Sequence, residues 1–518
     1  MKKLVVVVVV LAAILLLAPF GVGKLAEKRM NHGLDRMAEQ VGYLVVVDRK
    51  WTGGWFKSRQ EVTFEVSPAF AQAMNADKIE EIFNEADAAG EPAVEAEDAP
   101  AADEEDAPAS DSTEATDDSA PDAAEPEAPA PANPLRFKVF NDVLHGPVLG
   151  LSGFGVARVD TTLDLSPETQ AKIREVFGPK KALDIRTRVG FFGGGTTTFT
   201  SEGRTIKTKD DDDEISYDTV KLALGYGRNG DSYDIDGKMP KFQVKSKDGK
   251  QVLITAVTLD GDGERVKGDL YDGDFEFRIG EIKFDEPTGN SGFSVEDAHY
   301  EVEMDTENNF VTMAAKMGTG PFKNAALSSS GLELKEVHYD FSLRRLHADS
   351  LEKMFRSMRD VYSVTPENKT PEEVQAAIME PMKEHGVELL KHDPEFSIDR
   401  VGFVTPEGEG VLKGLIKFVG VTPEDFSAPG GMAVLAKLDA DLTIEVAVKL
   451  AEKIPNGATM AGAAVDSGYA KRDGEKYVCH ILFKNGELTI NGKPQAIPGL
   501  GGPPAGAMGN PEEAPAGE

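Results

Sequence analysis

The commonest pattern along this chain is the alternation of apolar and polar positions. Glu61 to Val66 alternates residue by residue, as expected for a strand with one buried face. Similar segments, many followed by Gly, Asn or Asp, recur at 137–144, 155–163, 182–192, 217–224, 252–259, 275–284, 299–304, 310–313 and 332–342. Their regular succession predicts a long antiparallel meander.

Helical signals are fewer. A helix is predicted from Ser166 to about Phe177, and another begins at Asp349, interpreted as an N-cap with Glu352 three residues later. A third begins at the Thr370 capping box. Strands return at 396–404, 410–419, 476–483 and 487–490, whereas 439–449 fits a strand or a helix. We therefore predict an α+β fold dominated by a long antiparallel β-sheet, with a few packed helices.

The chain begins with an uncharged apolar run, residues 4–23, preceded by Lys2 and Lys3. Twenty helical residues at ~1.5 Å each span about 30 Å, the thickness of a bilayer's hydrocarbon core. A cleaved signal peptide and an uncleaved signal anchor both fit, and the length favours the anchor. The short N-terminus favours a body outside the cytoplasm over a cytosol-facing one. We expect a single transmembrane helix in a bacterial inner membrane, with the C-terminal body in the periplasm.

The pattern divides the chain into six segments. They are the transmembrane signal anchor 1–23, an amphipathic helix and first β-hairpin 24–86, an acidic Ala/Pro-rich insert 87–133, a β-rich region 134–345, helices plus a β-rich C-terminal region 346–495, and a tail 496–518. The insert has 16 Asp or Glu in 47 residues and no Lys or Arg. Such a composition buries too little apolar surface to offset chain entropy, so the insert is predicted to be disordered. The Gly/Pro-rich tail is predicted to be disordered as well.

The net charge and the cysteine content exclude several classes of protein. The net charge is −33, which argues against nucleic-acid partners. Cys479 is the only cysteine, so the chain can form no internal disulfide and carries no lipoprotein cysteine after the apolar run.

No catalytic, cofactor or metal site is predicted. The eight histidines lack His-x3-His or His-Glu-x-x-His spacing. Asp260 to Glu264 begins like a calcium loop, but the sixth position is Arg265 and the twelfth is Tyr271. His145 precedes Gly-Pro at a strand end, which favours a structural role in a turn over a catalytic role. Trp51 and Trp55 flank a Gly-Gly turn, where they either close a sheet end or contact a membrane interface or partner.

Short motifs in a fixed order carry a family resemblance. They are the N-terminal apolar run, the Gly54-Trp55-Phe56-Lys57-Ser58 segment, the Leu144-His145-Gly146-Pro147 segment and the final segment around Asn491-Gly492. In this order the chain resembles the bacterial YdgA family, whose members carry a domain of unknown function. The resemblance implies a periplasmic body on an inner-membrane anchor and brings no catalytic residues. The acidic insert departs from the family pattern.

These observations favour a non-enzymatic envelope protein that binds or scaffolds. A curved sheet with an apolar inner face would suit lipid acyl chains, which makes a lipid or an envelope protein the expected partner, beside the membrane itself. The alternative is an envelope hydrolase whose residues converge only in three dimensions, for example a pocket that joins His145 to a carboxylate and a hydroxyl. A self-associating homo-oligomer is the third hypothesis.

Overall fold

The computed structural model describes most of the predicted body. The described residues are 22–35, 44–66, 136–150, 153–164, 170–171, 173–174, 177–178, 181–207, 213–287, 292–364, 385–422, 424–425 and 432–495. The predicted anchor, apart from its last two residues, lies outside them, as do the acidic insert and the tail. Among the described residues, no helix has the length and apolar character needed to cross a bilayer.

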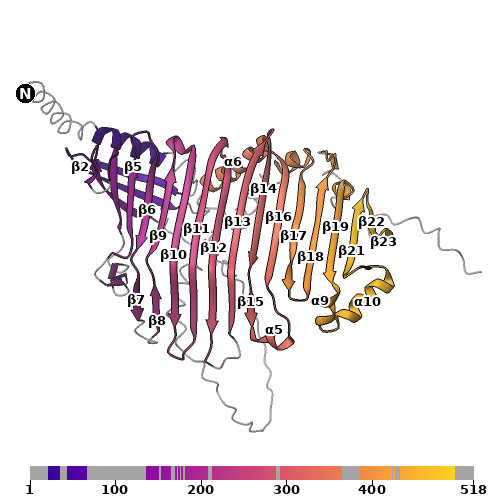
Figure 1. The fold of residues 1–518 in the computed structure, drawn as a ribbon. Helices are drawn as coiled ribbons and strands as arrows, with labels where there is room; N and C mark the ends of the chain where they lie inside the picture. Colours follow the sequence, from indigo (N-terminus) through magenta and orange to yellow (C-terminus); the bar gives the residue numbers. More distant parts are fainter. Residues whose placement is uncertain are drawn as a thin grey trace, which may run out of the picture.

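One antiparallel sheet dominates the described part of the chain (Figure 1). Its first strands are β1 (Leu44–Thr52), β2 (Lys57–Val66), β3 (Arg136–His145), β4 (Ala157–Asp164), β5 (Asp184–Val189), β6 (Gly195–Ser201), β7 (Arg204–Lys207), β8 (Glu214–Tyr217) and β9 (Val220–Tyr226). The central strands are β10 (Ser232–Lys245), β11 (Gln251–Lys267), β12 (Leu270–Asp285), β13 (Phe293–Glu307), β14 (Phe310–Thr319), β15 (Phe322–Asn324) and β16 (Glu336–His347). The last are β17 (Glu395–Thr405), β18 (Gly408–Phe418), β19 (Leu438–Ala447), β20 (Lys471–Asp473), β21 (Lys476–Lys484), β22 (Glu487–Ile490) and β23 (Lys493–Gln495).

Sequence neighbours are spatial neighbours almost throughout this sheet. The long strands stand side by side in chain order, from magenta to yellow in Figure 1. The short strands β7, β8, β15 and β20 pair beside this path, and β9 and β8 share the same side of β10. The predicted β-dominated α+β fold is therefore confirmed.

The described residues contain few helices, and most of these are short. They include 22–35, the helical residues 170–171, 173–174 and 177, the 3-10 helix η2 (Arg228–Gly230), α5 (Ala325–Ser330), α6 (Ala348–Val364), 385–390, α8 (Met432–Leu435), α9 (Val448–Lys453) and α10 (Gly457–Ser467). The helical residues at 170–177 fall inside the predicted helix from Ser166, whereas the start of the predicted helix at Thr370 lies outside the described residues. The ambiguous segment 439–449 is a strand that passes directly into α9. Asp349 is not the N-cap of α6, because the helix already includes Ala348 and the Asp349 carboxylate binds Lys267 and Asn309 instead.

The register places apolar residues in continuous rows, because directly paired residues of antiparallel strands point to the same face. One row joins Met304, Met313, Leu343, Phe396, Ile416, Ala440, Phe483 and Leu488. The next joins Val302, Ala315, Phe341, Ile398, Gly414, Leu442, Ile481 and Ile490. The third joins Tyr300, Met317, Tyr339, Val401, Leu412, Ile444 and Cys479. We call the face that carries these rows the apolar face.

A bulge keeps β17 in step with this face. Its apolar residues are two apart from Phe396 to Ile398 and from Val401 to Phe403, but three apart in the middle. The register shift between Ile398 and Val401 absorbs the extra residue, so all four lie opposite apolar or glycine partners in β18. The rows therefore cross β17 without interruption.

The same face continues to the first strands. The Met304 row runs back through Gly273, Gly263, Tyr233, Tyr226, Gly195, Val189 and Ala157 to His145. Helix 22–35 covers this end, where Ala26 packs with Val143, Val156, Ala157, Val159 and Val189. Farther along, α6 packs Leu351, Met354 and Phe355 near Met304 and Met313. Two helices thus cover two parts of one face.

Candidate functional site: the apolar face and the pocket at its first strands

Large apolar side chains remain exposed along the three rows. Tyr300, Met317, Tyr339, Leu343 and Ile444 are between 36% and 49% exposed. None of the residues in these rows is charged. Scattered exposed apolar residues are normal on a protein surface, but continuous ones mark a binding surface. The part of the apolar face that carries these exposed side chains, from β13 to β19, is therefore the first candidate site.

The opposite face carries charges. Its residues alternate with those of the rows, and they form ion pairs such as Lys316–Glu301 at 3.3 Å, Arg344–Asp399 at 2.7 Å and Lys476–Glu445 at 2.6 Å. Exposed pairs of this kind contribute at most about 1 kcal/mol each to stability. Their main effect is to keep this face hydrated, which distinguishes it chemically from the apolar face.

A cavity of about 500 Å³ lies at the first strands, beside helix 22–35. The helix lines it with Gly23, Lys24 and Glu27. The turn between β1 and β2 contributes Gly53, Gly54 and Trp55, and strands β1, β2 and β3 add Trp51, Ser58 and His145. The cavity therefore joins the end of the predicted anchor to two of the family-motif segments.

Ser58 and His145 form a buried hydrogen bond in this cavity. The Ser58 Oγ lies 2.9 Å from Nε2 of His145, and Nδ1 lies 3.1 Å from the Trp55 carbonyl oxygen. A carbonyl only accepts, so Nδ1 carries a proton, and in the neutral imidazole Nε2 then accepts from the Ser58 hydroxyl. The Gly54 backbone N–H also points to Ser58 Oγ, at 3.4 Å. The two ring nitrogens of His145 thus contact a hydroxyl and a carbonyl. Among the described residues, no carboxylate is hydrogen-bonded to His145.

Gly146 and Pro147 shape the turn that follows His145. The peptide bond between them is cis, and the Gly146 N–H donates to the Val156 carbonyl at 2.8 Å. A Cβ at Gly146 would collide with the Gly155 carbonyl oxygen, so only glycine fits there. Trp55 and Phe56 project from the facing turn and are about half exposed.

The last motif lies elsewhere. Asn491 and Gly492 form the turn between β22 and β23, both with positive φ, at the opposite end of the strand order. The Asn491 side chain accepts from the His480 N–H at 3.0 Å and donates to the Gly468 carbonyl at 3.2 Å. The structure thus brings four of the nine motif residues, Gly54, Trp55, Ser58 and His145, to the lining of one cavity. Phe56, Gly146 and Pro147 lie beside these residues in the chain, and Asn491 and Gly492 form a separate turn.

The sequence reasoning missed the residues that the helix contributes. Gly23, Lys24 and Glu27 lie on one helical face by their spacing, but nothing local predicts which strands that face meets. The contact with His145 is close: a Cβ on Gly23 would collide with the imidazole ring. Arg29 also ties the helix down by donating to the Gly190 and Phe191 carbonyls at 2.7 and 2.9 Å.

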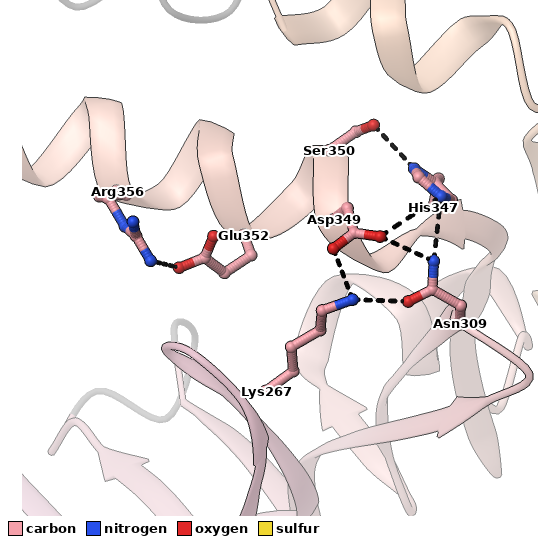
Figure 2. Close-up of polar contacts among 7 residues, drawn as sticks. All are labelled: Lys267, Asn309, His347, Asp349, Ser350, Glu352 and Arg356. Carbon is pink, nitrogen blue, oxygen red and sulfur yellow. Dashed lines mark hydrogen bonds and ion pairs between the residues drawn. The ribbon is translucent and has the colours of Figure 1, made fainter.

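A second polar cluster holds the start of α6 (Figure 2). The Nδ1 of His347 lies 2.9 Å from Ser350 Oγ, and Asn309 Nδ2 donates to Nε2 at 3.0 Å. Asn309 Oδ1 accepts from Lys267 Nζ at 2.8 Å, and Lys267 also pairs with Asp349 at 2.5 Å. Because the Asn309 amide donates to Nε2, the network is built around a neutral His347.

His392 adds a second imidazole to this cluster. Its ring stacks on that of His347 with centroids 3.9 Å apart. Burial, and then the charge of His392, lower the pKa of His347 from its ordinary 6.5, while Asp349 and Glu388 oppose the shift and Lys267 adds to it. Within the described residues, no group of three His, Cys, Asp or Glu side chains is close enough to hold a metal ion.

Comparison with known proteins places the chain in a family. Residues 1–498 match the family described as "Bacterial protein of unknown function (DUF945)", and the chain belongs to it. No curated protein and no solved structure gives a significant match.

Two glycines of helix 22–35 provide a matched test of the cavity. Gly33 is exposed with open space around it, so Gly33→Ala should raise stability by about 1 kcal/mol through helix propensity. Gly23→Ala should lower it by about 1–3 kcal/mol, because the new methyl displaces the helix from His145. Chemical denaturation of both variants measures the difference. Equal effects would show that Gly23 does not contact the histidine.

Acid should destabilise the α6 cluster. Since the pKa of His347 is lower in the folded state, the unfolded chain takes up the proton first as the pH falls below 6.5. The contribution of neutral His347 to the stability of the fold is complete above pH 6.5, and it is lost as the pH falls toward the pKa of His347 in the folded state. His392→Gln removes the neighbouring imidazole whose charge lowers the pKa of His347. Between about pH 7.5 and about pH 5, the melting temperature of this variant should therefore fall less than that of the wild type.

His32→Gln is the control for this pH experiment, because His32 is exposed on helix 22–35, away from the cluster. Its acid response should equal that of the wild type. An unchanged acid response in His392→Gln would contradict the role of the stacked pair.

Proposed function

We propose that this chain is an anchored protein of the bacterial envelope whose periplasmic body binds lipid acyl chains on the apolar face. The observation that carries the proposal is the set of three uncharged rows that cross the sheet from β13 to β21 with large side chains exposed. Acyl chains need no hydrogen-bond partner, which suits a surface without charged side chains.

The membrane part of the proposal rests on the sequence. The uncharged run 4–23 has the length of a bilayer span, and the resemblance to the YdgA family implies the same anchor and orientation. Helix 22–35 begins where this run ends and packs on the first strands of the apolar face. An anchored body of this kind would hold the face close to its lipid source.

The energetic argument concerns water. Each CH₂ group of an acyl chain that leaves water gains about 0.8 kcal/mol, and the exposed Tyr, Met and Leu side chains gain in parallel. A single chain lying across several rows would therefore bind without any polar contact. A carboxylate placed within its path would remain unpaired and cost several kcal/mol.

Adjacent residues of β19 offer a matched test. Ile444 lies on the apolar face, whereas Thr443 lies on the charged face between Lys413 and His480. We expect Ile444→Glu to lower the lipid occupancy of the full-length protein at least about tenfold, since that corresponds to only ~1.4 kcal/mol. Thr443→Glu should retain wild-type occupancy. Native mass spectrometry of protein purified from an exporting bacterial host reads the bound lipid directly.

Two outcomes would count against the proposal. A folded wild-type protein that carries no lipid would remove its basis, as would equal occupancy in the two variants. The same spectra report the oligomeric state, and a stable oligomer that buries Ile444 would support self-association through the apolar face.

A hydrolase is the second candidate, favoured by the Ser58–His145 hydrogen bond. A serine hydroxyl that donates to a neutral imidazole is the arrangement of an activated nucleophile, here oriented by the Trp55 carbonyl in place of a carboxylate. A fluorophosphonate probe should then label the wild type and fail to label Ser58→Ala. Ser342→Ala, at another buried serine, should label normally. A folded wild type that stays unlabelled would eliminate this candidate.

A further inference from the structure

We propose that the cavity beside helix 22–35 binds the zwitterionic head group of an aminophospholipid, a phosphate with a nearby ammonium. The inference rests on the proposed function, because it names the class of lipid whose acyl chains would lie beside the first strands of the apolar face. The motif residues around Ser58 and His145 would then bind the head group, whereas the apolar face would bind the acyl chains.

The cavity offers partners for both charges of such a head group. Glu27 provides a carboxylate and Lys24 an ammonium on adjacent turns of the helix, and Trp51 of β1 and Trp55 of the β1–β2 turn line the same cavity. Aromatic faces and a carboxylate attract an alkylammonium, while a lysine attracts a phosphate. The volume of about 500 Å³ lies in the range of small-molecule sites.

Little free energy is needed to separate Lys24 from Glu27, so both charges can bind a ligand. Lys24 and Glu27 pair with each other at 2.9 Å, and their side chains are 67% and 27% exposed. An exposed pair of this kind contributes at most about 1 kcal/mol, so an entering zwitterion can separate it and give each charge a new partner. Ser58 and His145 already hydrogen-bond to each other and to the Trp55 carbonyl, so neither of them needs a hydrogen bond from the ligand.

The position of the cavity fits a lipid rather than a free solute. Gly23 ends the apolar run and lines the cavity, so a run that spans the bilayer would place Lys24 at the depth of the head groups. His145 shares its register row with Val189, Tyr226 and Met304 of the apolar face. A head group in the cavity would therefore have its acyl chains beside the start of that face.

The two tryptophans make the test direct, because they are the only ones in the chain and both line the cavity. Full-length protein in detergent micelles is titrated with dihexanoyl phosphatidylethanolamine while tryptophan emission is recorded. We expect a saturable change in emission, and dihexanoyl phosphatidylglycerol, which lacks the ammonium, should bind at least about tenfold more weakly. Glycerophosphoethanolamine tests the head group without acyl chains and should produce the same emission change at higher concentration.

Two variants of one helix complete the experiment. Glu27→Gln should weaken the response to phosphatidylethanolamine about tenfold. Asp35→Asn should leave it unchanged, because the Asp35 carboxylate pairs with Arg49 and does not line the cavity. Equal responses to the two lipids, or an unchanged response in Glu27→Gln, would overturn the assignment.

The proposed function and this inference can fail separately. If phosphatidylethanolamine leaves the emission unchanged while Ile444→Glu still releases bound lipid, the head-group site is wrong and the acyl-chain surface stands. If the emission responds as expected but lipid occupancy does not depend on Ile444, the cavity binds its ligand without the apolar face.

Discussion

Cross-strand register is the constraint on which this structure depends. In the part of the chain that the structure describes, a single sheet extends strand by strand and buries few side chains fully, so most of its residues remain half exposed. Backbone pairing then decides which side chains meet, and a slip of one residue would exchange the two faces. The observed register instead aligns Met304, Val302 and Tyr300 with apolar partners across strand after strand. One face is thereby left free of charge and the other carries the ion pairs.

The two covering helices follow from the same constraint. Helix 22–35 and α6 each pack on an apolar surface that the register provides, and polar contacts hold each of them in addition. Arg29 binds two carbonyls of the β5–β6 turn, and the Asn309–His347 network fixes the start of α6. These polar contacts fix the position of each helix on the face.

Much of the fold was readable from the sequence, because alternation such as Glu61 to Val66 reports one buried face directly. The bulge between Ile398 and Val401 appears only as a break in spacing, and its meaning depends on the partner strands. The site was less accessible. Ser58 and His145 are 87 residues apart, with the acidic insert between them, so their hydrogen bond is a product of strand pairing. Asp349 was misassigned because its partner Lys267 comes from a distant strand.

The connectivity of the sheet has a consequence for how such a protein changes size. Because each long strand pairs with the next one in the chain, the β-hairpin is the unit of growth, and an inserted or deleted hairpin would leave every other pairing intact. Strands lie about 4.8 Å apart, so each hairpin would lengthen or shorten the molecule by about 10 Å. The reach of the body from its first helix is thus set by a simple count of hairpins.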